Sequence, residues 1–188
     1  MRTLADRNAI DAMIVGLGDT VRQWMDRGDD GAGWALIGIR SRGDLIAQRM
    51  ADHLSKTHSE DRIDGRVGTL DITLYRDDLS EIGSDAVVRT TEVPFAIDGL
   101  NLVLIDDVLM TGRSIRAALA SLTDLGRARR VWLAVLVDRG GRELPIAPDA
   151  VGMDLTDIAA SDRVNVMLRP TDERDAIVVE PAHAVTQP

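Results

Sequence analysis

Two long apolar runs with an amphipathic segment between them constrain the fold of this chain most. Residues 101–107 read NLVLIDD and residues 130–138 read RVWLAVLVD, and both are apolar along most of their length. Strands of this kind are typical of parallel sheets that helices cover on both faces. Between them, residues 114–125 repeat apolar side chains at helical spacing and end at Gly126, a common helix terminator. The sequence therefore predicts an α/β fold with a mostly parallel central sheet flanked by helices.

Other segments continue this alternation of strands and helices. The alternation within TLDITLY predicts a half-exposed strand, and a long polar loop follows it over residues 76–95. We expect a single domain over residues 1–180 and a disordered tail over 181–188. The remaining expected elements are helices over 10–27 and 44–57 and strands over 33–39, 69–75, 164–168 and 176–180.

Composition excludes several classes of protein. The chain has no cysteine, which rules out a disulfide framework and thiolate metal sites and fits a reducing compartment. No apolar run approaches the roughly 20 residues that cross a membrane, and the N-terminus lacks the apolar stretch of a signal peptide. We therefore expect a cytoplasmic protein with no membrane partner. The net charge of −9 disfavours nucleic acid as a partner, because phosphate contacts need clustered Lys and Arg.

An acidic pair at the end of the first apolar run marks a candidate ligand site. Asp106 and Asp107 end the expected strand, and ligands of open α/β sheets bind at the carboxyl ends of strands. The helix that follows offers free N–H groups, a helix dipole and the hydroxyls of Thr111 and Ser114, all of which favour an anion such as phosphate. Gly112 allows close approach of the backbone. Two acids beside a phosphate suit sugar hydroxyls or the water shell of Mg²⁺.

Four stretches resemble a known family. LVLIDDVLMTGRS (102–114) resembles the phosphoribosyl pyrophosphate (PRPP) motif of the type I phosphoribosyltransferases. GIRSRG (38–43), DITLYRDDL (71–79) and AVLVDRGGRELPI (134–146) are similar to the PyrR family of bifunctional pyrimidine operon regulators with uracil phosphoribosyltransferase activity. The resemblance runs from the first helix to about Glu180. It implies the type I phosphoribosyltransferase fold, with a flexible loop over the site, a small base-binding hood and assembly as a homodimer or homotetramer.

The resemblance also implies a reaction, in which uracil and PRPP give UMP and diphosphate. Mg²⁺ would arrive with PRPP and lie near Asp106 and Asp107, with no dedicated metal ligands in the protein. The implied catalytic residues are Arg76, Asp106 and Asp107. The implied PRPP-binding residues are Ser41, Arg42, Asp106, Asp107, Val108, Leu109, Met110, Thr111, Gly112, Arg113 and Ser114. The implied base-binding residues are Val137, Asp138 and Arg139.

Three positions depart from the family pattern. Met110 stands where Tyr is usual, Ser114 where Thr is common, and Gly141 where His is usual in the segment DRGHRELP. Ser114 keeps a hydroxyl, and we expect Met110 to preserve packing. Gly141 removes a side chain that would face either the base or RNA.

The family also regulates pyrimidine genes by binding messenger RNA, with UMP as its signal, and this role is the less expected one here. Residues 143–162 hold five acids and no Lys or Arg, and the first thirty residues hold six Asp against four Arg. Neither segment suits a phosphate backbone. We expect a uracil phosphoribosyltransferase in which binding of a pyrimidine mRNA leader is lost or changed. The alternatives are an RNA-binding attenuator that uses the fold as a nucleotide sensor, and a phosphoribosyltransferase for another base.

Overall fold

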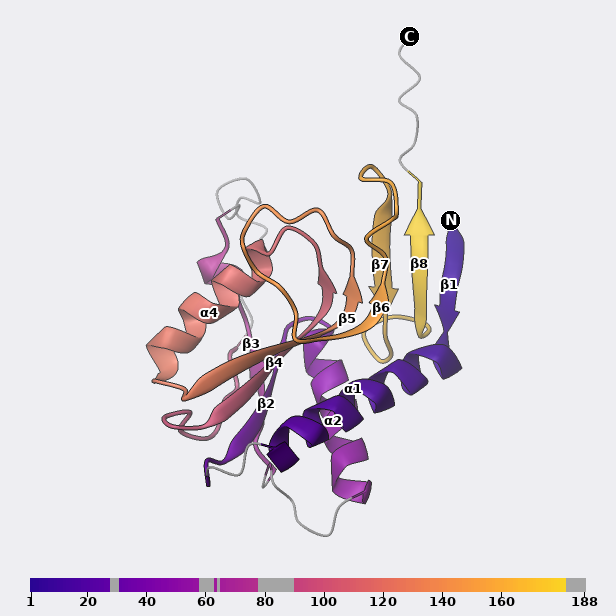
Figure 1. Ribbon diagram of the computed structural model, residues 1–188. Helices are drawn as coiled ribbons and strands as arrows, with labels where there is room; N and C mark the ends of the chain where they lie inside the picture. The colour runs from indigo at the N-terminus through magenta and orange to yellow at the C-terminus, as the bar shows by residue number, and fades with distance from the viewer. Residues whose placement is uncertain (28–30, 58–62, 64, 78–89, 182–188) are drawn as a thin grey trace.

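The computed structural model describes residues 1–27, 31–57, 63, 65–77 and 90–181 (Figure 1). Residues 182–188 of the predicted tail 181–188 and residues 78–89 of the predicted loop 76–95 therefore lie outside the described residues. The elements are β1 (Arg2–Asp6), α1 (Arg7–Arg27), β2 (Trp34–Ile39), α2 (Gly43–Thr57), β3 (Val67–Leu70), the single-turn helix η1 (Thr73–Tyr75), β4 (Asn101–Leu109), α4 (Arg113–Leu125), β5 (Arg130–Asp138), β6 (Ala150–Asp154), β7 (Arg163–Met167) and β8 (Ala176–Glu180).

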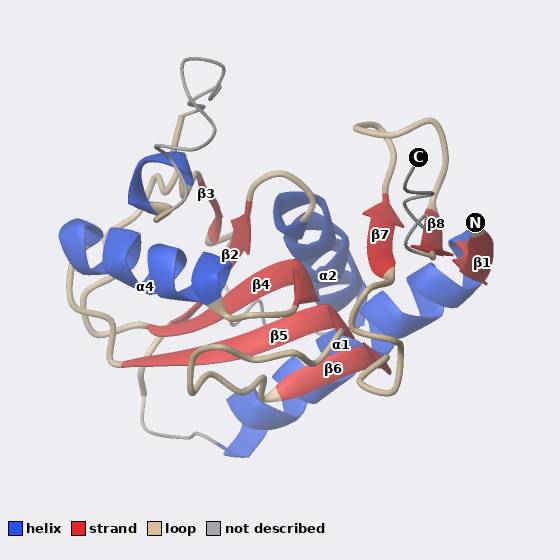
Figure 2. Ribbon diagram, turned by 90° about the horizontal axis from the view of Figure 1, so that it is seen from above, coloured by secondary structure: helices blue, strands red, loops and turns tan. Residues whose placement is uncertain are grey.

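Five of these strands form a parallel sheet in the order β3-β2-β4-β5-β6, with β4 at its centre. Helices α1 and α2 cover one face and α4 covers the other (Figure 2). Side chains of β4 alternate between these layers: Val103 and Ile105 join the core under α1 and α2, whereas Leu102 and Leu104 join the core under α4. The predicted α/β fold with a parallel sheet flanked by helices is confirmed.

A second, antiparallel sheet of order β1-β8-β7 stands beside the carboxyl edge of the main sheet, and we call it the hood sheet (Figure 1). Ala5, Val166 and Ile177 from its three strands are buried in the same core as Leu36 of β2. The hood sheet is therefore packed onto the α1–α2 side of the main sheet. It corresponds to the small hood that the family resemblance implied, although β1 was not expected from the sequence.

The predicted strand over residues 69–75 is wrong in its second half. β3 ends at Leu70, and residues 73–75 form η1 instead. The Asp71 carboxylate accepts hydrogen bonds from the N–H (2.8 Å) and the hydroxyl (2.5 Å) of Thr73, and this local turn replaces strand pairing. As a result Leu74, which the alternating pattern placed in the core, is 65% exposed.

The chain changes direction across the sheet between β2 and β4. From β2 it passes through α2 to β3 at one edge, and from β4 it passes through α4 to β5 and β6 at the other. Because α2 and α4 lie on opposite faces, the loops that follow β2 and β4 diverge at the carboxyl edge. Such a topological switch point is the usual ligand site of an open α/β sheet.

Two glycines let the loop after β2 lie directly on this edge. A Cβ on Gly43 would lie 2.4 Å from the carbonyl oxygen of Ile105, and a Cβ on Gly38 would lie 2.4 Å from the Cα of Asp44. Both neighbouring atoms belong to the backbone and cannot rotate away. The RSRG loop therefore keeps its place beside the end of β4 only while these positions lack side chains.

Replacement of Gly43 by Ala tests this packing. We expect the Gly43→Ala variant to lose about 1–3 kcal/mol of unfolding free energy, because the added methyl must push two backbone segments apart. Urea denaturation would measure the loss. The control is Gly16→Ala, since Gly16 is exposed in α1 with no atom within 4 Å of the new Cβ, and it should be neutral or stabilising by up to about 1 kcal/mol. Equal stability of the two variants would contradict the expectation.

Candidate active site

The acidic pair lies within β4, as expected, and the strand continues two residues beyond the predicted end at Asp107. Asp106 is only 7% exposed, and its carboxylate accepts the N–H of Asp107 at 2.9 Å. The Asp107 carboxylate accepts the N–H of Val108 at 2.8 Å. Burial, and then the neighbouring charge of Asp107, raise the pKa of Asp106 well above its usual value. Burial also raises the pKa of Asp107, against the opposing charge of Arg42.

Arg42 stands beside this pair and is held by the hood sheet. Its Nε and Nη2 donate to Oδ2 and Oδ1 of Asp172, each at 2.8 Å, across 130 positions of sequence. The pairing raises the pKa of Arg42 and lowers that of Asp172. Ser41, the other residue expected at the diphosphate, is half-buried and follows a cis peptide bond from Arg40. The RSRG loop thus presents a fixed guanidinium next to the two carboxylates.

The loop between β4 and α4 has the form of an anion site. Gly112 precedes the first residue of α4 with a positive φ of 90°, a conformation that favours glycine. The carbonyl of Thr111 accepts the N–H groups of Glu143 and Leu144 at 3.0 and 3.1 Å, which ties the loop to the segment after β5. The N–H of Arg113 donates to the hydroxyl oxygen of Thr111 at 3.3 Å. The first N–H groups of a helix have no partner within the helix, so those of Ser114 and Ile115 suit an anion such as phosphate, as does the half-buried hydroxyl of Ser114.

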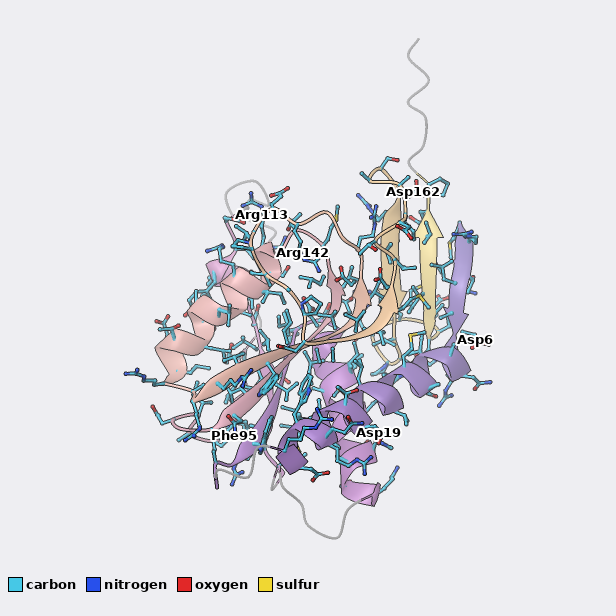
Figure 3. The ribbon with its side chains drawn as sticks, in the orientation of Figure 1. Asp6, Asp19, Phe95, Arg113, Arg142 and Asp162 are labelled. Carbon is cyan, nitrogen blue, oxygen red and sulfur yellow. The ribbon has the colours of Figure 1, made fainter. Side chains whose placement is uncertain are left out.

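Arg113 connects this loop to two other segments. Its Nη1 donates to Asp77 at 2.5 Å and its Nε donates to Glu143 at 2.7 Å. Arg116 also donates to the carbonyl of Tyr75 at 3.0 Å. Arg76, one of the expected catalytic residues, is exposed between Tyr75 and Asp77, so these contacts hold its backbone at the start of α4. In Figure 3, Arg113 and Arg142 lie near each other at this end of the molecule.

The three residues expected to bind the base are used within the protein. Val137 is fully buried in β5. The Asp138 carboxylate accepts the N–H of Gly140 at 2.9 Å and Nη2 of Arg142 at 2.6 Å. The guanidinium of Arg139, 3% exposed, donates to the carbonyls of Ile158, Ala159 and Asp162. These side chains shape the loops around the site, and their role toward a base stays a prediction.

A cleft of about 580 Å³ lies between the end of β4 and the hood sheet. Its lining residues are Met1, Arg42, Asp107, Val108, Val164, Asn165, Val166, Met167, Val178 and Glu180. The expected PRPP residues Arg42, Asp107 and Val108 form one wall, and the hood strands form the other. The pattern VNVML predicted this strand, but nothing in the sequence indicated that the strand would lie across the cleft from the acidic pair.

The described residues contain no cluster of three acidic or histidine side chains that could hold a metal. Asp106 and Asp107 form a pair of adjacent carboxylates, and Mg²⁺ needs only one or two carboxylates when substrate phosphates and water complete its shell. The pair therefore fits a Mg²⁺ ion that enters with a phosphorylated substrate. In the part of the chain that the structure describes, no helix has the length and apolar character needed to span a membrane.

Comparison with known proteins agrees with the fold and the site. Residues 10–166 match the family model of the phosphoribosyl transferase domain, so the chain is a member of that class. It resembles two solved hypoxanthine phosphoribosyltransferases: that of Trypanosoma cruzi, with a TM-score of 0.68 at 17% identity over 97% of each chain, and that of Staphylococcus aureus, with a TM-score of 0.57 at 18% identity over 84% and 80%. At such identity the likeness shows the type I phosphoribosyltransferase fold alone.

Curated relatives define the family more narrowly. Proteins described as "Bifunctional protein PyrR" are 48% identical in Elusimicrobium minutum, over 77% of this chain and 79% of the relative. The corresponding proteins are 51% identical in Deinococcus deserti, over 76% of each chain, and 50% identical in Thermus thermophilus, over 77% and 78%. The chain therefore belongs to the PyrR family, as its motifs predicted.

Replacement of Asp106 by Asn should separate stability from function. The amide oxygen can still accept the Asp107 N–H, while the charge that burial disfavours is gone. Because the folded pKa of Asp106 is raised, the parent protein loses stability as the pH rises above the unfolded value of about 4. We expect the variant's advantage to widen between about pH 4 and pH 7, with Tm rising about 2–4 °C per kcal/mol gained.

The same variant should lose at least about tenfold in turnover of PRPP, because the charge beside the ribose is missing. Thermal unfolding across the pH range and steady-state kinetics on the same preparations would measure both effects. A variant that is less stable than the parent at pH 7 would contradict the assigned effect of burial.

Proposed function

We propose that this protein is a uracil phosphoribosyltransferase that converts uracil and PRPP into UMP and diphosphate, with Mg²⁺ carried by PRPP. The observation that carries the proposal is the juxtaposition, at one switch point, of the buried Asp106–Asp107 pair, the N-terminus of α4 and Arg42. Membership of the PyrR family supports the choice of chemistry. We also propose that the protein acts in uracil salvage in the cytoplasm and that it assembles as a homodimer or homotetramer.

Each element of the site has a defined task in this reaction. Residues 110–114 hold the 5′-phosphate of PRPP on backbone N–H groups and on the hydroxyls of Thr111 and Ser114. Asp106 and Asp107 would accept hydrogen bonds from the ribose hydroxyls and would hold, through water, the Mg²⁺ that arrives with PRPP, which would supply positive charge to the phosphorylated substrate. Arg42 donates to the leaving diphosphate, and Arg76 adds a second cation from the segment anchored by Asp77.

Catalysis then depends on position and charge. The displacement at the anomeric carbon passes through a transition state with positive charge on the ribose ring. Carboxylates fixed in a buried site stabilise such a charge without having to reorganise, and the guanidinium of Arg42 stabilises the negative charge that develops on diphosphate. Enclosure by the hood sheet limits access of water, which would otherwise hydrolyse PRPP.

The hood side of the cleft is the place for the base. Among the lining residues that the structure describes, Asn165 is the one neutral polar side chain, and it lies beside Val164, Val166, Met167 and Val178. An amide offers both donors and an acceptor, which matches the mixed edge of uracil. We propose that Asn165 reads this edge together with the backbone of residues 137–139.

Replacement of Asn165 by Ala should raise the KM for uracil about tenfold, the value of one hydrogen bond to a neutral partner, and should change the KM for PRPP much less. Initial rates with each substrate varied in turn would measure this. The matched control is Asn8→Ala on the exposed start of α1, which should behave as the parent. An equal rise in both KM values would instead indicate a general disturbance of the site.

A panel of bases tests the proposed reaction itself. Purified protein with PRPP and Mg²⁺ should release diphosphate with uracil and much less with hypoxanthine, guanine, adenine or orotate. Preferred turnover of another base would replace uracil by that base. Absence of turnover with every base would leave a nucleotide sensor and would overturn the enzymatic proposal.

Regulation through RNA is a second candidate function, favoured by the description of the relatives as bifunctional. The acidity of residues 143–162 still argues against it. The Asp149 carboxylate accepts the N–H of Leu133 at 2.8 Å, and that of Asp154 accepts the N–H of Thr156 at 2.9 Å. Such a bond does not remove the negative charge of a carboxylate, and the bonds from Thr156 lower the pKa of Asp154. Titration with the organism's pyrimidine leader RNA, with and without UMP at two salt concentrations, would measure the affinity for RNA. Tight binding that UMP enhances would show that regulation is retained, whereas weak, salt-sensitive binding would show that it is lost.

A further inference from the structure

We propose that Asp172, in the turn between β7 and β8, is a positioning residue that holds Arg42 in the orientation that receives diphosphate. The inference rests on the proposed phosphoribosyl transfer, since it assigns Arg42 to the leaving group. Asp172 lies outside the four stretches that resemble the family, and the proposal adds a residue of the hood to those that act on the substrate.

The contact between the two residues has the geometry of a fixed clamp. Asp172 engages the Nε–Nη2 edge of the guanidinium through two hydrogen bonds of 2.8 Å, with the side chains 16% and 28% exposed. Two parallel charge-assisted bonds fix the plane of the guanidinium as well as its distance. This leaves the N–H groups of Nη1 for another anion, and Arg42 lines the cleft beside Asp107.

The carboxylate that does the holding is itself fixed. Oδ2 of Asp172 also accepts the N–H of Leu168 at 2.7 Å, and the N–H of Asp172 donates to the carbonyl of Leu168 at 2.9 Å. Leu168 is fully buried in the core below the hood sheet. The orientation of Arg42 is therefore set by a rigid turn and does not depend on the short RSRG loop alone.

Without this clamp, Arg42 has a competing partner. Asp107 is the other carboxylate whose charge acts on Arg42, and a freed guanidinium would turn toward it. That movement would withdraw Arg42 from diphosphate and would neutralise a carboxylate that the ribose and Mg²⁺ need. Asp172 thus keeps the guanidinium of Arg42 apart from Asp107. Arg42 remains available to diphosphate, and the acidic pair remains available to the ribose and Mg²⁺.

The same turn contains a matched control. Asp175 is also paired with an arginine, since its Oδ2 accepts Nη1 of Arg49 on α2 at 2.7 Å and its Oδ1 accepts the N–H of Arg169 at 2.7 Å. Arg49 does not line the cleft. Asp175 therefore anchors the hood turn as Asp172 does, but through an arginine that does not line the cleft.

The test compares Asp172→Asn with Asp175→Asn. We expect Asp172→Asn to weaken binding of magnesium diphosphate, measured by calorimetry, and to raise the KM for PRPP about tenfold, with a smaller change in kcat. Asp175→Asn should lower the Tm and leave diphosphate affinity unchanged. Arg42→Ala should weaken diphosphate binding as well, and adding Asp172→Asn to it should have no further effect, because the two residues act as one unit.

Two outcomes would overturn the proposal: parental diphosphate affinity in Asp172→Asn, or equal losses of affinity in Asp172→Asn and Asp175→Asn, which would indicate only a loosened hood. If Asp172→Asn does not fold, the comparison of Arg42→Ala with Arg42→Lys serves instead, because Lys keeps the charge but cannot take the two-bond orientation, and a parental affinity in the Lys variant would reject the clamp. Diphosphate binding is measured without a base, so failure of uracil turnover leaves this test intact.

Discussion

The burial of two adjacent carboxylates at the end of the central strand is the constraint on which the rest of the site depends. β4 is paired on both sides and covered on both faces, so Asp106 has little access to water. A backbone N–H offsets that desolvation at Asp106. Arg42, backbone N–H groups and the hydrogen bond with Asp106 offset it at Asp107, and the pKa of both acids remains raised. A fold selected only for stability would place apolar residues here. In the proposed function, these acids interact with the ribose hydroxyls and with the hydrated Mg²⁺ of the substrate.

Arginines join the loops around this pair, and each does so over a long distance in sequence. Arg42 reaches Asp172 in the hood, Arg113 reaches Asp77 and Glu143, and Arg139 reaches three carbonyls beyond β6. The planar guanidinium suits such multiple contacts, which a lysine would not provide.

The positions of the arginines around α4 also bear on RNA binding. α4 is about 20 Å long, so Arg113 and Arg116 at its start lie far from the arginines that follow its end, and these residues do not form one basic patch.

The parts of the fold that the sequence predicted are those with strong local signals. The continuous apolar runs predicted β4 and β5 because both faces of these strands are buried, and helical spacing predicted α1, α2 and α4 to within a few residues. β1 and β6 were missed, since RTLAD and AVGMD are short edge segments whose pairing is set by distant partners. The prediction for Leu74 was wrong because the hydrogen bond from the Thr73 hydroxyl to the Asp71 carboxylate competes with strand pairing. The acidic pair and the phosphate loop were predicted from their motif, whereas Asn165 and Asp172 became visible only when the hood sheet was placed.

The two departures from the family pattern at Met110 and Gly141 lie next to each other in the structure. A Cβ on Gly141 would lie 3.8 Å from Cε and Cγ of Met110, so the two positions are neighbours across the phosphate loop and the segment after β5. Gly141 has a positive φ of 73°, which glycine adopts without strain, and Met110 is 41% exposed rather than packed in the core. What holds this place together is backbone: the carbonyl of Met110 accepts Nη1 of Arg142 at 2.9 Å, whatever side chain residue 110 carries. Both departures therefore affect the surface beside the candidate phosphate loop, whose contact with Arg142 is made by the backbone.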